Sequence, residues 1–333
     1  MGRRGPALLS VLTAALTVAA LAVGCTSTKA GSDESTGDGK TKIGLVTKTD
    51  SNPYFVALRD AAKAEADKHG AELVALAGKF DGDNDGQVAA IENLVQQGAK
   101  TILVTPNNST GILGAIKKAR DRGVLVIALD TETDPQDAVD ATIATDNTNA
   151  GRLQGQYVKA ALNGQPARSI LLDGTPGSTV SEQRHAGFVE AAQPENLGTE
   201  ATNGEQNKAQ QATENLLQRV AGSVNSIYTL NEPAARGAYS ALKAKGLADK
   251  VIIGSIDGSC DGVRAVKNGE IAVTVMQFPK KMAEQGVQFA VEFAKSGKKP
   301  TGFVETETAV ITDKPLPGID SKDTAWGLEN CWG

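Results

Sequence analysis

Polar and aromatic side chains follow six short apolar segments of this 333-residue chain, directly or in the loop or helix start that comes next. The segments are rich in β-branched residues, as the strands of a buried sheet are. The side chains that follow them are, in chain order, Lys48, Asn52, Tyr54, Phe55, Asp130, Arg184, Asn231, Asp257 and Gln277. If the segments are parallel strands of α/β units, their carboxyl ends meet along one edge. We therefore expect these side chains to converge on one place.

This set of groups suits a polyhydroxylated ligand, because each sugar hydroxyl both donates and accepts hydrogen bonds. Carboxylates accept such bonds, Arg and Lys only donate them, and Asn and Gln do both. The apolar face of a sugar ring packs on a flat surface. Tyr54 and Phe55 are adjacent in a chain with only 7 Phe, 4 Tyr and 2 Trp, and we expect both rings to face the ligand rather than the core. The alternative for a single residue such as Asp130 or Asp257 is helix capping or turn formation.

Catalytic patterns fit the sequence less well. The chain has 2 histidines, His69 and His185, which we interpret as surface residues rather than acid–base or metal-binding groups. The sequence contains no G-x-S-x-G elbow, no phosphate-binding P-loop, and no G-x-G-x-x-G motif after the first apolar segment. Asp130 and Asp257 could serve as the carboxylate pair of a glycosidase, although such an enzyme also needs one carboxyl with a raised pKa. We predict a binding protein that is not an enzyme and needs no cofactor.

One segment matches a calcium-binding loop. Asp81, Asp83, Asp85 and Gly86, followed by Glu92, fit the pattern D-x-[DN]-x-[DN]-G-x5-E. The competing interpretation is a helix that begins near Asp85, because apolar residues recur after it with helical spacing. In that case Asp83 caps the helix, and Glu92 is carried away from the loop oxygens. We favour the helix and predict no metal site.

The elements that must position these residues alternate regularly along the chain. Near-continuous apolar runs, typical of strands buried on both faces, occupy 43–46, 73–77, 101–104, 124–129, 169–172, 226–230, 251–256 and 271–275. Helical patterns occupy 54–69, 86–97, 111–122, 150–162, 208–220 and 232–245. This alternation is typical of right-handed βαβ units. The strand count predicts the α/β class, with two doubly wound parallel-sheet lobes joined by a hinge and a ligand cleft between them.

The first 40 residues differ in character from the rest. Arg3 and Arg4 precede the uncharged run 7–23, and a small residue and Cys25 follow. This order is typical of a secretory signal peptide, and the alternative is a transmembrane span, for which the run falls short of the ~20 residues needed. Residues 26–40 have no aliphatic side chain larger than alanine and predict a flexible tether. The net charge of -5 gives no indication of a nucleic-acid partner.

Motifs at the strand ends resemble those of a known family. They are NPYF at 52–55, VIALD at 126–130, ATDN at 144–147, QRHAGF at 183–188, NEPAARGA at 231–238 and IDG at 256–258. With these motifs the chain, from Lys42 to about Leu316, resembles the type I periplasmic binding proteins of sugar ABC importers, in the ribose- and fructose-binding group. The segment LAVGC, which ends at Cys25, resembles a bacterial lipobox. The resemblance implies ligand contacts at the same positions, from Lys48 to Gln277, that the strand ends indicate.

The resemblance also implies lobes that share the chain. It places a signal peptide at 1–24, a lipidated cysteine with its tether at 25–40, an N-terminal lobe at 41–145 plus 278–306, and a C-terminal lobe at 146–277 plus 307–333. Three departures from the ribose-binding pattern argue against ribose itself. Lys48 and Thr131 replace a small polar residue and an arginine, and no aromatic residue lies near Gly204. We expect a fructose-like ketose or a pentose.

The implied function is capture of a monosaccharide at the outer face of the cytoplasmic membrane, by a lipid-anchored monomer that delivers it to an ABC permease. Alternatives are a sugar-sensing co-receptor for chemotaxis or a sensor kinase, a carbohydrate-active enzyme, and a repressor of the same fold, whose DNA-binding helices the signal and tether replace here. If Cys25 carries lipid, Cys260 and Cys331 remain as a pair in an oxidising compartment. They predict a disulfide that ties the C-terminal Cys-Trp-Gly segment to the loop after Asp257, beside the cleft.

Overall fold

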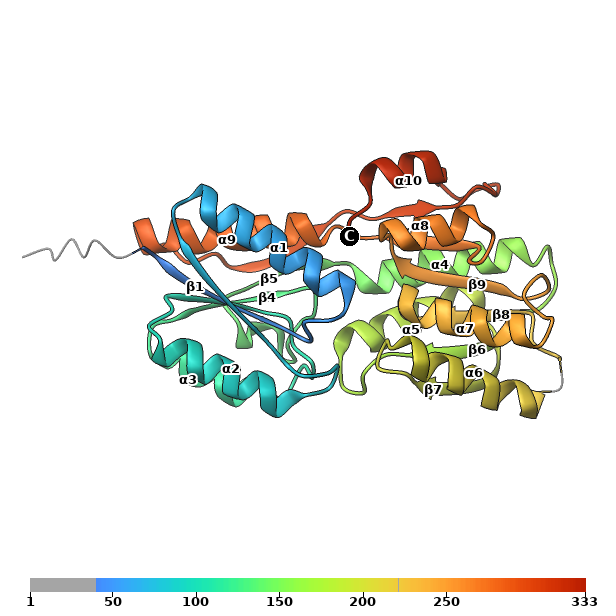
Figure 1. The fold of residues 1–333 in the computed structure, drawn as a ribbon, viewed down its shortest axis with the longest axis horizontal. Helices are drawn as coiled ribbons and strands as arrows, with labels where there is room; N and C mark the ends of the chain where they lie inside the picture. Colours follow the sequence, from blue (N-terminus) through green and yellow to red (C-terminus); the bar gives the residue numbers. More distant parts are fainter. Residues whose placement is uncertain (1–39, 221) are drawn as a thin grey trace, which may run out of the picture. The chain divides into compact units, whose positions relative to one another are not determined.

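The computed structural model describes residues 40–220 and 222–333. The predicted signal peptide, the predicted lipid attachment site Cys25 and nearly all of the predicted tether lie outside the described residues. Within the described ranges, every helix is too short or too polar to cross a membrane. Two six-stranded sheets organise this part of the chain, and helices pack on them (Figure 1).

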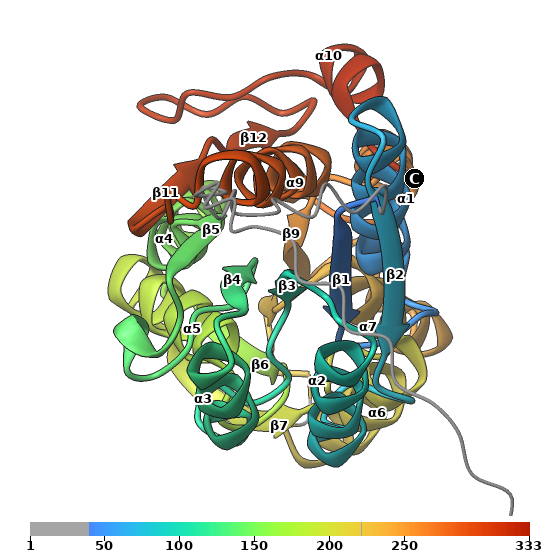
Figure 2. The same cartoon turned by 90° about the vertical axis from the view of Figure 1, so that its left-hand side faces the viewer.

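The first sheet is parallel throughout and has the strand order β11-β5-β4-β3-β1-β2. Its strands are β1 (Lys42–Thr47), β2 (Glu72–Ala77), β3 (Thr101–Val104), β4 (Leu125–Leu129), β5 (Ala141–Thr145) and β11 (Gly302–Thr306), with the short 3-10 helix η1 (Gln136–Ala138) before β5. Helices α1 (Pro53–Lys68) and α9 (Pro279–Ser296) pack together on one face, and α2 (Asn84–Gln96) and α3 (Leu113–Asp121) on the other, as Figure 2 shows. Every residue of β3 and β4 is buried, which explains their continuous apolar sequences.

The second sheet has the strand order β12-β10-β9-β8-β6-β7. Its strands are β6 (Arg168–Asp173), β7 (Glu195–Ala201), β8 (Ser226–Thr229), β9 (Ile252–Asp257), β10 (Val273–Met276) and β12 (Ala309–Ile311). Its helices are α4 (Asn147–Ala161), α5 (Thr179–Ala192), α6 (Gln206–Val220), α7 (Glu232–Ala244), α8 (Cys260–Lys267) and α10 (Thr324–Asn330). The helices pair closely as α4 with α5 and as α6 with α7, and each pair shares a core with the sheet.

The predicted α/β class with two doubly wound sheets is confirmed. The predicted strand runs leave out four strands, namely β5 and the edge strands β7, β11 and β12. An edge strand has one neighbour and exposes polar residues, so the sequence ENLGTEA of β7 lacks a continuous apolar run. The expectation of a parallel sheet is wrong at one edge, because β12 pairs antiparallel with β10.

The chain crosses from one sheet to the other three times, and we call these three crossover segments passages. The passages lie between β5 and α4, between β10 and α9, and between β11 and β12. The first ends at Asp146, whose side chain accepts a hydrogen bond from the Asn149 backbone N–H (2.8 Å) and so begins α4. Gln277 lies in the second passage. Both sheets are therefore assembled from separated parts of the chain.

Helices α4 and α5 approach each other closely because glycines line their contact. A Cβ atom on Gly151 would lie 2.0 Å from the Arg184 carbonyl oxygen, and one on Gly187 would lie 2.0 Å from the Thr148 carbonyl oxygen. No side chain fits at such a distance, so the two helix backbones are in direct contact. Because α5 carries Arg184, this contact fixes where its guanidinium lies.

We expect Gly151→Ala to destabilise the protein by about 1–3 kcal/mol, because the added methyl group must push α5 away. Chemical denaturation followed by circular dichroism measures the change. Gly114→Ala is the matched control, since a Cβ atom on this helical glycine meets nothing within 4 Å. A Gly151→Ala protein as stable as the Gly114→Ala protein would contradict the proposed close contact.

Candidate functional site

The side chains that follow the predicted strands come together in one cavity. All of the predicted ligand-binding residues line it, namely Lys48, Asn52, Tyr54, Phe55, Asp130, Arg184, Asn231, Asp257 and Gln277. They come from the carboxyl ends of strands in both sheets, from the helices that follow them, and from the second passage between the sheets. The cavity therefore lies where the two sheets face each other, as α/β folds place their ligands.

Arg184 is a cation buried in the wall of this cavity, with 2% of its surface exposed. Its Nε donates to Asn147 Oδ1 (2.8 Å), and its Nη1 donates to the Leu230 carbonyl oxygen (3.0 Å) and lies 3.7 Å from Asp257 Oδ1. Among the described residues, its Nη2 has no hydrogen-bond partner. A buried donor without a partner is costly. Because Arg184 lines the cavity, we infer that this donor is available to a ligand oxygen.

Asp257, the last residue of β9, is held in place from two sides. Its Oδ1 accepts a hydrogen bond from Gln277 Nε2 (2.8 Å). The loop that follows it is fixed by the buried carboxylate of Glu232, which accepts from the backbone N–H groups of Gly258 (2.8 Å) and Ser259 (3.0 Å). Gly258 has φ +77°, and a Cβ atom there would lie 2.3 Å from Met276 Cγ, so only glycine fits the turn.

Asp130 and Asp257 both have unusual backbone conformations, with φ values of 64° and 148°. Residues with side chains rarely adopt these values, and such strain persists only where the surrounding structure imposes it, often at functional sites. Neither carboxylate caps a helix of the described chain, since Ser259 caps α8 after Asp257 and no α-helix follows Asp130 before Asp146. The capping alternative is therefore wrong for both. Asp130 instead accepts a hydrogen bond from Thr131 Oγ1 (2.8 Å).

The adjacent rings of Tyr54 and Phe55 contribute both to the cavity wall and to the hydrophobic core. Tyr54 and Phe55 line the cavity, but they are 4% and 5% exposed and belong to the core beneath α1 and α9. The expectation that they leave the core is therefore wrong. Lys48 Nζ lies 6.0 Å from the centre of the Phe55 ring and donates to Ser178 Oγ (3.4 Å). Burial, with the nearby Asp130 carboxylate, raises the pKa of Tyr54 well above its ordinary value, so this side chain remains a neutral phenol.

Asn52 and Asn231 also have a second role, as helix caps. Asn52 Oδ1 accepts from the Tyr54 backbone N–H (3.0 Å) at the start of α1, and Asn231 Oδ1 accepts from the Ala234 backbone N–H (3.1 Å) at the start of α7. Asn231 Nδ2 donates to the Gly204 carbonyl oxygen (3.2 Å). Each amide is thus oriented by its helix, which presents the remaining N–H groups in a fixed direction.

Sequence reasoning missed one carboxylate of the cavity, Asp81, which lies 4 residues after the end of β2. In the sequence it fits only a possible calcium loop, against which we favour a helix, and the structure confirms that helix. Asp83 caps α2 by accepting from the Gly86 backbone N–H (3.0 Å), and Glu92 pairs with Lys118 (2.9 Å). In the ranges that the structure describes, no group of three or more His, Cys, Asp or Glu side chains could hold a metal ion.

The other residues missed by the sequence prediction come from loops and helix starts. They are Thr175, Ser178, Val180, Ser181, Asn203, Gly204 and Leu230. No periodicity marks such positions. His69 and His185 lie at the partly exposed surface, as predicted, where each pairs with a carboxylate, that of Glu65 or Asp173.

Burial in the cavity raises the pKa values of two carboxyl groups, Asp81 and Asp257. Burial raises the pKa of Asp81 to about 6, against the opposing effect of the Lys48 ammonium. Burial and the neighbouring Glu232 carboxylate raise the pKa of Asp257 above its ordinary range, and the Arg184 guanidinium acts against this rise. With Asp130, three carboxyl groups thus share the cavity with two cations. Compared with an anionic ligand, such a site favours a neutral ligand that can donate several hydrogen bonds.

A cavity between two doubly wound sheets, lined by carboxylates, amides and cations, defines a two-lobed binding protein. The periplasmic binding protein domain family matches residues 43–299. The chain is 34% identical over 264 residues to the ribose import binding protein RbsB of Salmonella typhimurium, covering 78% of this chain and 86% of that protein. The chain belongs to this periplasmic binding protein family, whose relatives are sugar-binding transport proteins rather than enzymes.

Solved structures of similar proteins share the fold. A solute binding protein of Actinobacillus succinogenes with bound D-allose superposes with a TM-score of 0.74 at 28% identity, covering 82% of this chain and 98% of that one. A myo-inositol binding protein of Caulobacter superposes with a TM-score of 0.77 at 26% identity, covering 83% and 94%. The predicted family and fold are therefore confirmed.

We expect Asp257→Ala to weaken sugar binding by about 2–3 kcal/mol, which is roughly 30- to 150-fold in Kd, because Arg184 loses its carboxylate ion-pair partner and the ligand hydroxyls lose an acceptor. Isothermal titration calorimetry measures the change. Asp261→Ala is the matched control, since this exposed carboxylate on α8 pairs with Arg264 and does not line the cavity. Equal affinity of the Asp257→Ala and wild-type proteins would remove Asp257 from the site.

We expect sugar affinity to fall as the pH is lowered through about 6, where Asp81 gains a proton. A protonated carboxyl has less acceptor capacity for ligand hydroxyls, so proton uptake opposes sugar binding, and binding is strongest above the pKa. Calorimetric titrations between about pH 5 and 8 measure the slope. In Asp81→Asn the fall of sugar affinity near pH 6 should disappear. In Asp83→Asn, two residues away at the cap of α2, this fall should remain. A step that persists in Asp81→Asn would assign the titration to another group.

Proposed function

We propose that this protein binds one monosaccharide between its two lobes and delivers it to an ABC importer. The observation that carries the proposal is the buried Arg184 Nη2, which lacks a partner in the described chain, on a side chain that lines a cavity together with three carboxyl groups. A sugar supplies what these groups need, since its oxygens accept from the guanidinium and its hydroxyls donate to the carboxylates. The sugar-binding relatives support the same conclusion.

The chemistry of the cavity supports a fructose-like ketose or a pentose. Thr131 Oγ1 donates to Asp130 and so occupies one of its acceptor positions, while Lys48 adds a donor beside Phe55. Asn203, Gly204 and Asp81 also line the cavity, and they present polar groups where an aromatic ring would favour an apolar sugar face. The ligand would therefore be small and hydroxylated on most sides.

We further propose that the lobes, at 41–145 plus 278–306 and at 146–277 plus 307–333, close around the sugar. Direct contacts between the lobes support this. The Ser109 backbone N–H donates to the Gly177 carbonyl oxygen (2.9 Å), and Gln183 Nε2 donates to Glu132 Oε1 (3.0 Å). Ligand contacts to both lobes would add to these bonds and so favour the closed population.

We also propose that the mature protein is a monomer anchored by lipid at Cys25, outside the cytoplasmic membrane, and that its closed form docks on a membrane permease. The second candidate is a sugar-sensing co-receptor, which would bind the same ligand at the same site and differ only in its membrane partner. Loss of sugar uptake on deletion of the gene supports the importer, whereas normal uptake with a lost sensory response supports the co-receptor.

A thermal-shift screen tests the binding step. A sugar present at about 100 times its Kd stabilises the folded protein by about 2.7 kcal/mol, which raises the melting temperature by several degrees. We expect pentoses and ketoses to produce this rise and sugar phosphates to produce none. The Asp257→Ala protein should respond more weakly to the same sugars. A flat response of the wild-type protein to every neutral sugar would overturn the proposed function.

A further inference from the structure

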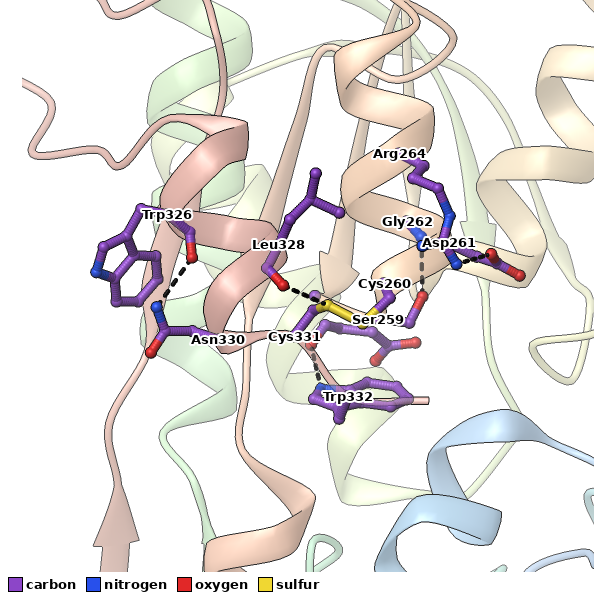
Figure 3. Close-up of a disulfide and its surroundings, with 12 residues drawn as sticks. Ser259, Cys260, Asp261, Gly262, Arg264, Trp326, Leu328, Asn330, Cys331 and Trp332 are labelled. Atoms are coloured by element: carbon purple, nitrogen blue, oxygen red, sulfur yellow. Dashed lines mark hydrogen bonds and ion pairs between the residues drawn. A yellow bond between two sulfur atoms is a disulfide. The ribbon is translucent and has the colours of Figure 1, made fainter.

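The C-terminal segment of the chain is tied down beside the cavity. A disulfide joins Cys331 to Cys260 at the start of α8, as predicted (Figure 3). The Cys260 backbone N–H donates to the Trp332 carbonyl oxygen (3.0 Å), and Trp332 pairs with Ser259 in an isolated parallel bridge. A covalent bond and a backbone bridge therefore hold Trp332 next to the loop that follows Asp257.

The Trp332 indole contacts three residues of the cavity at once. Its single Nε1–H is shared between the carbonyl oxygens of Gln277 (2.9 Å) and Asp257 (3.2 Å). Its ring stands edge-on to the Tyr54 ring, with 5.3 Å between the centroids and an interplanar angle of 83°. The side chain is 2% exposed and does not itself line this cavity. It can therefore act on a ligand only through its neighbours.

These three neighbours come from different parts of the molecule. Tyr54 lies on α1 against the first sheet, Asp257 ends β9 of the second sheet, and Gln277 lies in the passage between them. They are also linked to each other, since Gln277 Nε2 donates to Asp257 Oδ1 (2.8 Å) and the Tyr54 hydroxyl lies 3.5 Å from Gln277 Oε1. Trp332 contacts all three residues and does not line the cavity itself.

We propose that Trp332, held by the Cys260–Cys331 disulfide, is a positioning residue for the sugar site. It fixes the backbone carbonyls of Asp257 and Gln277 and the plane of Tyr54, so that three groups from both lobes meet the ligand in one geometry. The inference rests on the proposed function. An indole is suited to this task because it combines a flat apolar face with one directional donor.

The test compares two tryptophan variants of the full chain, which has 2 tryptophans. Trp332→Phe keeps an aromatic ring and removes the N–H donor, and Trp326→Phe on α10 is the matched control. We expect Trp332→Phe to weaken sugar binding about tenfold in calorimetry, as for the loss of one buried hydrogen bond. In hydrogen–deuterium exchange without sugar, peptides covering 255–260 and 275–279 should exchange faster. Trp326→Phe should change neither quantity.

A second part of the experiment removes the Cys260–Cys331 disulfide. The double variant Cys260→Ser, Cys331→Ser should show the same two changes, and a phosphine reductant should change the wild-type protein in the same direction while leaving the double variant unaffected. Unchanged affinity or unchanged exchange in Trp332→Phe would overturn the positioning role. If the wild-type protein binds no sugar, the proposed function fails, and the exchange measurement still decides whether Trp332 holds these residues.

Discussion

The two sheets direct the carboxyl ends of their parallel strands toward the same cavity, and the rest of the structure depends on this constraint. It places charged residues in a buried space, where each charge is costly unless it has a partner. The protein meets that cost in part, through the bonds of Arg184 to Asn147 and Leu230 and of Asp257 to Gln277. What remains unmatched, such as Arg184 Nη2, is the part that we propose a ligand completes.

For the cavity, the sequence was most informative about residues that follow buried strands. Asp130 and Asp257 could be predicted because long apolar runs end directly before them. Asp81 could not, because it follows the half-exposed edge strand β2 by several residues and fits a calcium pattern equally well. The edge strands β7, β11 and β12 escaped prediction for a related reason, since edge position removes the burial that makes a strand recognisable. Strand β5 is buried but has only one large apolar side chain, Ile143, so it also lacks a continuous apolar run. Ser178 and Asn203 lie in loops, where only the folded chain brings them to the cavity.

Several side chains serve the fold and the cavity together. Asn52 and Asn231 begin helices while lining the site, and Tyr54 and Phe55 fill the core of the first lobe. A residue with two roles has a fixed orientation, because its helix or core neighbours restrict its rotamers. The walls of the site are thus fixed in orientation, and we propose that the motion needed for binding takes place in the three passages between the sheets.

The same three passages have a consequence for folding during synthesis. Helix α9, whose residues Met282, Val287 and Val291 cover an apolar face of the first sheet, is made only after all five parallel strands of the second sheet. Strand β11, the edge of the first sheet, is made later still. The lobe that begins the chain is therefore completed only when nearly all of the chain has been synthesised. Until then α1 covers that face without α9, and the apolar surface left uncovered is the one most exposed to aggregation or to a chaperone.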